Sequence, residues 1–570
     1  MTEAKISDTT LAEKSSRNDI ANDTFIIDDT SEAARKQGVT DVEKKAEREE
    51  DESQYPSTKI VAIVMLALYL AMYLVALDRT IISTAVPTIT DEFNSLGDVG
   101  WYGSAYLVTA CSLQLQFGRI FTLYHTKYVF LAAIGTFEVG SAICGAAPNS
   151  TAFIIGRAIA GAGNAGVFSG VIVIMIPLLP LRKRPAYQAT IGAIWGISSI
   201  TGPLIGGALA NNVSWRWCFY INLPIGAVAV LIIVFFVDIP SPEAAVTTRM
   251  EKIKRLDPLG NLVFLPGMVC LLLAIQWGGS KYDWSDGRIV ALLVLFGVLI
   301  LTWFWTQFQA KENATLPLHI LSQRSVAAGA FYSFCLGAVM MVWIYFLPIY
   351  FQAIFGSSAI RSGIQMLPLV LSLVVGNISA GSLVTAIGYY TPFLILSSCL
   401  MSIGAGLCST FGVHTTAPYW IGYQILVGWG IGCGMQQSST AAQRVLDKHD
   451  APIGVSLMFF GQSLGGVISL SAAQNVLSNN LISNLDSFPD VDPRTIIETG
   501  ATALRSIFSP SDLPEVLIAY NKAIRQTYYI ALGISCASII AGLSMEWRSV
   551  KGMKRGKASI FSRLSGRAAS

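Results

Sequence analysis

Three ionisable residues, Asp78, Glu138 and Arg157, lie inside long stretches of mostly apolar residues. A charged side chain at the centre of a lipid bilayer costs at least about 2.5–3.5 kcal/mol on the insertion scale, so such residues usually face the interior of a helix bundle and serve a function. The chemistry that these residue types offer is proton transfer. A carboxyl group can take up and release a proton, and a nearby arginine changes how readily it does so.

Helical geometry sets the depth of each of these residues. Glu138 lies ten residues beyond Tyr128, which is about 15 Å along a helix and near the membrane midplane. Asp78 and Arg157 both fall toward the outer third of their apolar stretches, where the two side chains could meet. We therefore predict that Asp78 or Glu138 carries a proton and that Arg157 tunes it. The alternative is structural: Asp78 pairs with the adjacent Arg79 or caps a kink, and Glu138 is a neutral acid bonded to a backbone carbonyl.

Motifs of soluble enzymes and of metal sites do not occur in the sequence. The four histidines, at positions 125, 319, 414 and 449, all fall in predicted loops, whereas an intramembrane hydrolase or metalloenzyme needs histidine at membrane depth. The nine cysteines form no CxxC or Cys/His cluster. A phosphate-binding GxxxxGK(S/T) loop is also absent from the sequence. We predict that the chain is not an enzyme, holds no metal or cofactor, and uses a proton gradient as its energy source.

The composition is that of an integral membrane protein. Of the 570 residues, 53% are hydrophobic and 13% are charged, and the charged share is about half that of a globular domain. Apolar windows of about 20 residues, the length that spans a bilayer core, recur along the chain. We predict fourteen transmembrane helices over residues 60–87, 99–118, 128–147, 152–180, 187–210, 217–237, 258–278, 288–308, 325–354, 362–387, 392–411, 418–441, 453–476 and 526–547.

These spans group as six, two and six, in an all-α integral membrane protein. The predicted parts are a disordered acidic tail at 1–58, an N-terminal six-helix bundle at 59–237, a loop with two inserted helices at 238–310, a C-terminal six-helix bundle at 311–547 with a long external loop at 477–525, and a basic tail at 548–570. Loops on the side of the termini carry thirteen Lys and Arg residues, against four in the opposite short loops. The positive-inside rule therefore places both termini in the cytoplasm.

A faint internal repeat relates the two six-helix halves. Residues 118–122, Gly-Arg-Ile-Phe-Thr, resemble residues 381–385, Gly-Ser-Leu-Val-Thr, and each stretch lies at the equivalent place in its half. Duplicated halves are typical of alternating-access transporters, which bind their substrate near the midplane between the halves.

Glycine recurs along the predicted span at 187–210. Glycines four residues apart lie on one helix face and let another helix approach closely, and Pro203 removes a backbone hydrogen bond. Packing of small residues would explain any one pair, but it explains the whole run beside Trp195 less well. The run consists of Gly192, Gly196, Gly202, Gly206 and Gly207.

Four segments can be compared together with known families. They are Leu77-Asp78-Arg79-Thr80-Ile81-Ile82, Gly156-Arg157-Ala158, Trp195-Gly196 through Gly202-Pro203 to Gly206-Gly207, and Trp215-Arg216-Trp217 through Asn222-Leu223-Pro224. In combination they resemble the major facilitator superfamily and, within it, the fourteen-span drug:proton antiporters, especially fungal toxin and multidrug efflux pumps. The resemblance covers about residues 59–547. It implies the major facilitator fold, with two six-helix bundles plus two inserted helices, and export by alternating access.

The resemblance also implies roles for individual positions. Asp78 matches the acidic residue of the first-span motif, and Arg157 matches the fourth-span arginine that is linked to proton transfer. Gly118, Arg119 and Lys127 fall where the family has its cytoplasmic gating loop. The acidic residue usual in that loop is replaced near Thr122, so the interdomain charge relay of the family is incomplete here. The antiporter motif, which is thought to control leak and direction, corresponds to Trp195, Gly196, Gly202, Pro203, Gly206 and Gly207.

A cavity for amphipathic compounds needs aromatic walls and a few amide groups. Hydrogen bonding between helices would explain each of the available residues equally well. The candidates for a substrate cavity are Gln116, Asn164, Trp195, Tyr350, Gln352, Gln436 and Gln462.

We predict a monomeric antiporter of a fungal plasma membrane. It would exchange inward protons for an outward amphipathic organic compound, such as a secondary metabolite, toxin or drug. One alternative is a proton-coupled importer or uniporter of a small nutrient such as a siderophore, amino acid or sugar, and another is a membrane sensor without transport. A vacuolar location also stays open. A nucleic-acid partner is not predicted, because no basic stripe interleaved with aromatics occurs outside the last twenty residues.

Overall fold

The computed structural model describes residues 55–93, 95, 98–237, 249–279, 282–485 and 513–551. The long regular elements among these residues are all helices, and two isolated β-bridges join Gly278 to Tyr282 and Tyr389 to Ser549. Contacts divide the chain into residues 1–58 and residues 59–570. Everything below concerns the second unit. Most of the predicted acidic tail and of the predicted basic tail lies outside the described residues.

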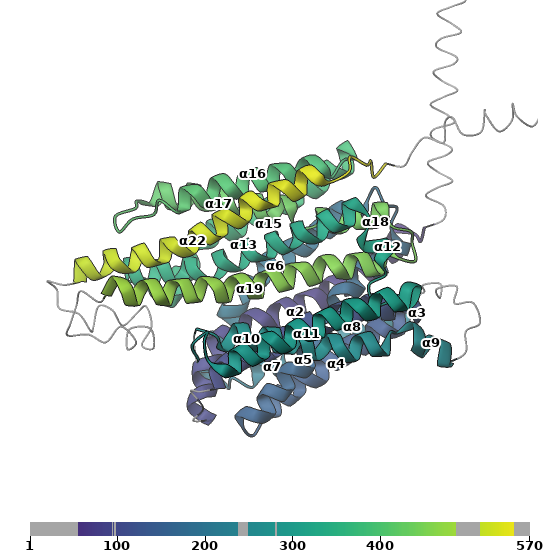
Figure 1. Cartoon of the computed structure of the whole chain (residues 1–570), viewed down its shortest axis with the longest axis horizontal. Coiled ribbons are helices and arrows are strands. Elements are labelled where there is room, and N and C mark those ends of the chain that lie inside the picture. Colours follow the sequence, from purple (N-terminus) through teal and green to yellow (C-terminus); the bar gives the residue numbers. More distant parts are fainter. Residues whose placement is uncertain are drawn as a thin grey trace, which may run out of the picture. The chain divides into compact units, whose positions relative to one another are not determined.

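The first half of the described chain forms helices α2 to α8 (Figure 1). The predicted span at 217–237 is present as two consecutive helices that meet at Ile221. Asn149 begins one of the long helices by accepting a hydrogen bond from the backbone nitrogen of Ala152. The helices are α2 (Thr58–Phe93), α3 (Val99–Leu123), α4 (Thr126–Ala146), α5 (Ser150–Leu178), α6 (Arg184–Asn212), α7 (Trp217–Tyr220) and α8 (Asn222–Phe236).

The inserted segment comprises α9 (Arg249–Arg255), α10 (Pro258–Trp277), α11 (Gly287–Ala310) and the 3-10 turn η2 (Lys311–Asn313). Asp257 caps α10 in a left-handed conformation with φ of 52°. Its carboxylate accepts hydrogen bonds from the backbone nitrogen of Gly260 at 2.9 Å and from that of Thr315 at 3.0 Å. One buried carboxylate thus ties the start of the inserted pair to the segment that follows it.

The second half contains α12 to α19 and α22. Gly356 and Gly388 both have positive φ and follow the last residues of two of these helices, where a side chain would be strained. The helices are α12 (Leu318–Leu321), α13 (Arg324–Phe355), α14 (Ala359–Gln365), α15 (Leu367–Ile387), α16 (Thr391–Cys408), α17 (Ala417–Gly434), α18 (Gln437–Val445), α19 (Ala451–Leu485) and α22 (Leu513–Ser544).

Each of the fourteen predicted spans contains a helix, and twelve of the described helices are long and apolar enough to cross a membrane. The helices α3 and α17 are not among the twelve. Serine, threonine and glutamine lower the hydropathy of α3, and glycine, tyrosine and tryptophan lower that of α17. The protein is therefore an all-α, multi-span membrane protein, and the count of fourteen spans stays a prediction.

The predicted external loop at 477–525 is wrong at both ends. Helix α19 continues to Leu485 and helix α22 begins at Leu513. Both extensions carry apolar residues three or four positions apart, which bury one face although the mean hydropathy is too low to predict a span. The buried residues are Leu477 and Leu481 in α19, and Val516, Leu517, Tyr520 and Ile524 in α22.

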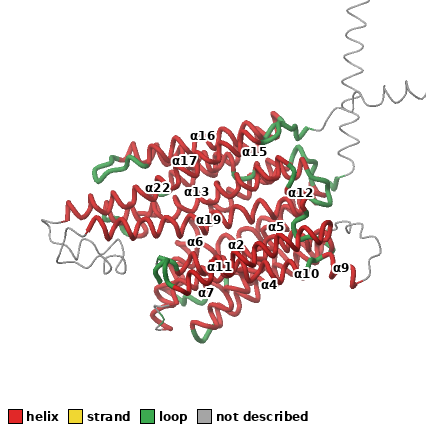
Figure 2. The backbone as a smooth tube through the Cα atoms, viewed as in Figure 1, coloured by secondary structure: helices red, strands yellow, loops and turns green. Residues whose placement is uncertain are grey.

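Helices of each half pack mainly on one another, and a few helices join the halves. In the first half α5 packs against α3 and α4, and in the second half α13 packs against α19 and α22. Across the seam between the halves, α6 packs against α15, and α19 packs against α3 and α5. In the described chain, the loops and turns drawn in green in Figure 2 lie mostly at the ends of the long helices.

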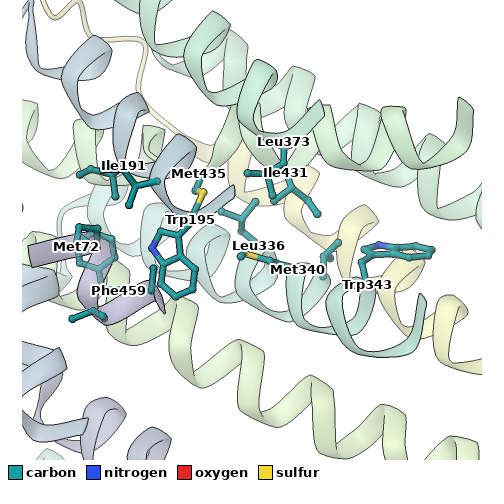
Figure 3. Close-up of a cluster of buried hydrophobic side chains, with 14 of the residues drawn as sticks. Met72, Ile191, Trp195, Leu336, Met340, Trp343, Leu373, Ile431, Met435 and Phe459 are labelled. Carbon is teal, nitrogen blue, oxygen red and sulfur yellow. The ribbon is translucent and has the colours of Figure 1, made fainter. Parts of the chain in front are cut away.

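An apolar cluster fills part of this seam (Figure 3). Met72 and Trp195 come from α2 and α6 of the first half, and Met340, Leu373 and Phe459 come from α13, α15 and α19 of the second half. All five are less than a tenth exposed. The seam is therefore a packed hydrophobic surface in which any polar group needs a partner or a purpose.

Candidate functional site

A buried ion pair joins α2 to α5. Nη1 of Arg157 donates to Oδ2 of Asp78 at 2.7 Å, and the two side chains are 1% and 0% exposed. Nε of Arg157 donates to the carbonyl oxygen of Tyr102 at 3.0 Å, and the guanidinium lies 4.4 Å above the ring of Tyr106. The predicted contact is present, and Asp78 pairs with Arg157 rather than with Arg79. Removing one partner of such a pair costs about 3–5 kcal/mol, because the other charge stays buried.

Asn222 holds the second oxygen of this carboxylate. Its Nδ2 donates to Oδ1 of Asp78 at 3.4 Å and to Oγ of Ser141 at 3.2 Å. Asn222 and Ser141 are both completely buried. Asn222 lies in one of the family-like segments of the sequence, but no role is predicted for it. The signal in the sequence that could have pointed to this role is an amide side chain directly before the apolar residues of α8.

Glu138 lies one helical turn before Ser141 on α4. Both of its carboxylate oxygens are buried without a hydrogen-bond partner in the described part of the chain, so the bond to a backbone carbonyl that the structural alternative required is not present. Its carboxyl group instead packs against Gly226 of α8, where a Cβ would collide with it. Gly226 follows Asn222 by one turn on α8, and Glu138 precedes Ser141 by one turn on α4. The two helices therefore meet at two successive turns, Ser141 with Asn222 at one and Glu138 with Gly226 at the next.

The glycine run of α6 lies against α2, next to Asp78. A Cβ on Gly202 would collide with Thr80, and one on Gly206 would collide with Thr84 and Ile81. Helix α6 is continuous through Pro203. The other glycines of the predicted antiporter motif differ: Gly196 faces Val374 of α15, whereas the position of a Cβ on Gly207 has no atom within 4 Å.

The predicted gating loop is not a loop. Gly118 and Arg119 lie inside α3, and Lys127 lies inside α4, so only Tyr124 and His125 connect these helices. The helix persists because its apolar face continues through Phe121 and Leu123, which are buried. Nζ of Lys127 donates to the carbonyl oxygen of Val234 at 2.8 Å, at the end of α8.

Arg119 binds main-chain oxygens instead of a carboxylate. Its Nε donates to the carbonyl of Arg255 at 2.9 Å, and its Nη2 donates to the carbonyl of Glu312 at 2.5 Å. These two carbonyls flank the α10 and α11 pair: one belongs to the last residue of α9 and the other lies in η2. Arg119 therefore connects α3 to the inserted helices.

The internal repeat corresponds to two equivalent contacts across the seam. A Cβ on Gly118 of α3 would lie 2.8 Å from Oγ of Ser456 in α19, and a Cβ on Gly381 of α15 would lie 2.5 Å from the carbonyl oxygen of Pro185 in α6. In each half, the glycine of the repeat is thus a point at which a helix of the other half approaches closely.

Three of the predicted cavity residues serve helix packing. The side-chain amides of Gln116 and Asn261 lie 3.0 Å apart, between α3 and α10. Oη of Tyr350 donates to the carbonyl of Gly412 at 2.8 Å. Nε2 of Gln352 donates to Oγ of Ser362 at 3.0 Å.

Other predicted cavity residues keep unused polar atoms near the seam. Oδ1 of Asn164, Nε1 of Trp195 and Oε1 of Gln436 are buried without a partner in the described part of the chain. Phe168, one turn after Asn164 on α5, lies with its ring centroid 4.5 Å from that of Phe459 on α19. Gln462 lies one turn after Phe459 on α19, so the antiparallel register puts Asn164 and Gln462 at about the same level.

Glu92 at the end of α2 organises the Trp215-Arg216 part of the fourth family-like segment. Nε1 of Trp215 donates to Oε2 of Glu92 at 2.6 Å, and Nη2 of Arg216 lies 2.8 Å from Oε1. The guanidinium of Arg216 also lies 4.5 Å above the ring of Trp215. This segment therefore fixes the connection between α6 and α7 to the end of α2.

Glu92→Gln is expected to lower the thermal stability slightly at neutral pH and not in acid. Hydrogen bonds from Arg216 and Trp215 lower the pKa of Glu92 below its ordinary value. A carboxylate with a lowered pKa stabilises the fold above the unfolded pKa of about 4.3, and the stabilisation is lost as the pH falls through the folded pKa. The pair is half exposed, so about 1 kcal/mol or less is involved. Melting temperatures of the two purified proteins should differ at neutral pH and converge in acid; a constant difference would contradict this.

Two helical halves around buried ionisable groups are typical of membrane transporters. The profile of the Major Facilitator Superfamily matches residues 68–470. The chain belongs to this superfamily, which indicates a transporter rather than an enzyme.

Known relatives are fungal transporters. The chain is 52% identical over 505 residues to the rubrofusarin-specific efflux pump aurT of Gibberella zeae, covering 88% of this chain and 92% of that one. It is 50% identical over 503 residues to the MFS-type transporter VdtG of Byssochlamys spectabilis, covering 88% and 90%. Among solved structures, the proton:xylose symporter XylE matches with a TM-score of 0.53 and 14% identity, covering 87% of this chain and 99% of that one. The last likeness shows the fold alone.

Proposed function

We propose that the protein is a proton-coupled antiporter that exports an amphipathic organic compound, such as a fungal secondary metabolite, toxin or drug. The observation that carries the proposal is the fully buried Asp78 and Arg157 pair, which Asn222 connects to Ser141, one helical turn from Glu138. A buried carboxylate that is held by one arginine is poised to change partners when it is protonated. Relatives that are named as efflux pumps support the direction of transport.

Protonation of Asp78 would remove the charge that holds Arg157 in place. The guanidinium would keep its bond to the carbonyl of Tyr102 and would lose its ionic one, so the contact between α2 and α5 would loosen. A second carboxyl group at Glu138, one helical turn away from Ser141, offers the proton a further site. Uptake and release of protons at these two carboxyl groups would couple the proton gradient to the movement of the first half.

Alternating access would require contacts across the seam to open. Oγ of Ser169 and Oγ of Ser456 lie 2.9 Å apart, and Oγ1 of Thr440 donates to Oε1 of Gln188 at 3.2 Å. Both contacts lie at the end of the bundle that the positive-inside rule assigns to the cytoplasm. We propose that this end is the cytoplasmic gate, that both termini face the cytoplasm, and that the protein works as a monomer in the plasma membrane without a cofactor.

The test uses everted membrane vesicles with an interior-acid gradient and a pH-sensitive dye. Addition of an exported compound should dissipate the gradient in vesicles that contain the protein and not in vesicles without it. A panel of amphipathic compounds should include the compounds of the known relatives. Correctly oriented protein that dissipates no gradient with any compound, or that accumulates a nutrient in intact cells with inward protons, would contradict export.

A further inference from the structure

Arg79 is a cation in the seam that has no carboxylate partner in the described part of the chain. Its guanidinium lies 5.5 Å from the ring centroid of Trp195 on α6, and its Nη2 lies 3.8 Å from Sδ of Met341 on α13. Met341 in turn packs against Gly466 of α19. Arg79 therefore reaches from α2 of the first half to helices of both halves.

The acids of the first half do not neutralise this guanidinium. Asp78 uses one oxygen for Arg157 and the other for Asn222. Glu138 packs against α8. The next acid along α2 is Asp91, which is twelve residues and about 18 Å further along the helix. An arginine without a carboxylate partner among the described residues is costly at a hydrophobic seam, and such a residue usually has a functional partner.

The surroundings of Arg79 offer hydrogen-bond donors and an aromatic wall. Nε1 of Trp195 is buried and has no hydrogen-bond partner among the described residues, and an indole N–H can only donate. The ring of Phe168 lies 6.1 Å from that of Trp195 and 4.5 Å from that of Phe459, so it extends the aromatic wall toward α19. Guanidinium groups likewise only donate. The missing partner must therefore bring an acceptor, and a negative charge satisfies both groups best.

We propose that Arg79 and Trp195 bind the acidic oxygen of an aromatic substrate, that is, a carboxylate, phenolate or enolate on a planar ring system. The oxygen accepts from the guanidinium and the indole N–H, and the ring system packs along Trp195 and Phe168. The protein then prefers anionic over cationic aromatic compounds of the same shape. This inference rests on the proposed function for its biological meaning, because it names the class of compound that is exported.

Direct binding of two matched dyes tests the preference. Fluorescein and rhodamine 123 share a xanthene ring system, and at neutral pH the first is an anion and the second a cation. Fluorescence anisotropy with the purified full-length protein in nanodiscs of neutral lipid gives both affinities. We expect fluorescein to bind about tenfold more tightly than rhodamine 123, the scale of one charge-assisted hydrogen bond.

Variants separate the charge from the packing. Arg79→Gln should weaken fluorescein binding about tenfold and leave rhodamine 123 unchanged or bound more tightly, and Arg79→Lys should retain most of the preference. Trp195→Phe keeps the aromatic ring, removes the N–H, and should weaken only fluorescein. Arg288→Gln is the matched control, because Arg288 also lies over an aromatic ring, that of Tyr282, but is exposed.

Several outcomes would overturn the inference. The first is that the wild-type protein binds both dyes equally or binds neither. The second is that Arg79→Gln weakens the binding of both dyes together. The third is that Arg288→Gln weakens fluorescein binding as much as Arg79→Gln does. If Arg79→Gln does not give a monodisperse protein, Arg79→Lys and Trp195→Phe decide the question. Binding needs no gradient, so a dye preference without proton exchange would refute the proposed antiport and leave this site standing.

Discussion

Asp78→Asn is expected to abolish proton-driven export, with a loss of at least about 100-fold, the lower end of what removal of a positioned proton-transfer group costs. Asparagine has the same shape but cannot take up a proton or pair with Arg157, whose Nη1 lies 2.7 Å from Oδ2 of Asp78. Export of a fluorescent substrate from cells, normalised to the amount of folded protein, measures the effect. Exchange of labelled for unlabelled substrate across the vesicle membrane, measured without a proton gradient, should persist because it requires no proton transfer.

A matched control lies on the same helix. Glu92→Gln makes the same chemical change at the end of α2, where the carboxylate is 45% exposed, and it should leave export nearly unchanged. Normal gradient-driven export by Asp78→Asn would exclude Asp78 as the proton carrier. Loss of both export and exchange would indicate damage to the fold, since Arg157 would then be buried without its partner.

Gly202→Val is expected to destabilise the protein by about 3 kcal/mol, the upper range for overpacking, and to reduce export accordingly. A Cβ on Gly202 would meet Cβ of Thr80 at 2.8 Å and the backbone nitrogen of Ile81 at 3.2 Å. Oγ1 of Thr80 is itself held by the carbonyl of Ser198 at 3.0 Å, so it cannot turn away freely. Helix α2 would have to move from α6, and the adjacent Asp78 and Arg79 would move with it.

Gly207→Val on the same helix provides the comparison, because a Cβ added to Gly207 would have no neighbouring atom within 4 Å. The melting temperature of each purified variant measures stability, and substrate efflux measures function. We expect a clear loss for Gly202→Val and almost none for Gly207→Val. Equal effects of the two substitutions would show that the motif acts through the flexibility of α6 and not through its contact with α2.

Much of this fold could be predicted from hydropathy, because the membrane restricts spans to long apolar helices. The ends of the helices could not, as the extension of α22 back to Leu513 shows. That extension is amphipathic and is held by packing on α19, a contact between residues distant in the sequence. Hydropathy also underrates α17, whose glycines carry no apolar side chain but let α15 and α16 approach closely.

The candidate site was predicted in part. Depth along the helices was enough to bring Asp78 and Arg157 together, because both are charged and charges are rare in spans. Asn222 and Ser141 are neutral and gave no comparable signal, and their role depends on how α4 and α8 face each other. That Arg79 has no carboxylate partner in the described part of the chain was equally hidden, since a sequence shows that a cation is present but not which acids are already paired.

The bond between Arg119 and two main-chain carbonyls has a consequence for how this protein can evolve. Every residue type carries a carbonyl oxygen, so the side chains at positions 255 and 312 can be exchanged without loss of the bond. An ion pair between two side chains is kept during evolution only if both residues are substituted together. The bond from Arg119 to main-chain carbonyls is kept even when the residues at positions 255 and 312 are substituted independently. The inserted helices could thus diversify rapidly, or be replaced by another helical pair with the same backbone path, while their attachment to α3 endures.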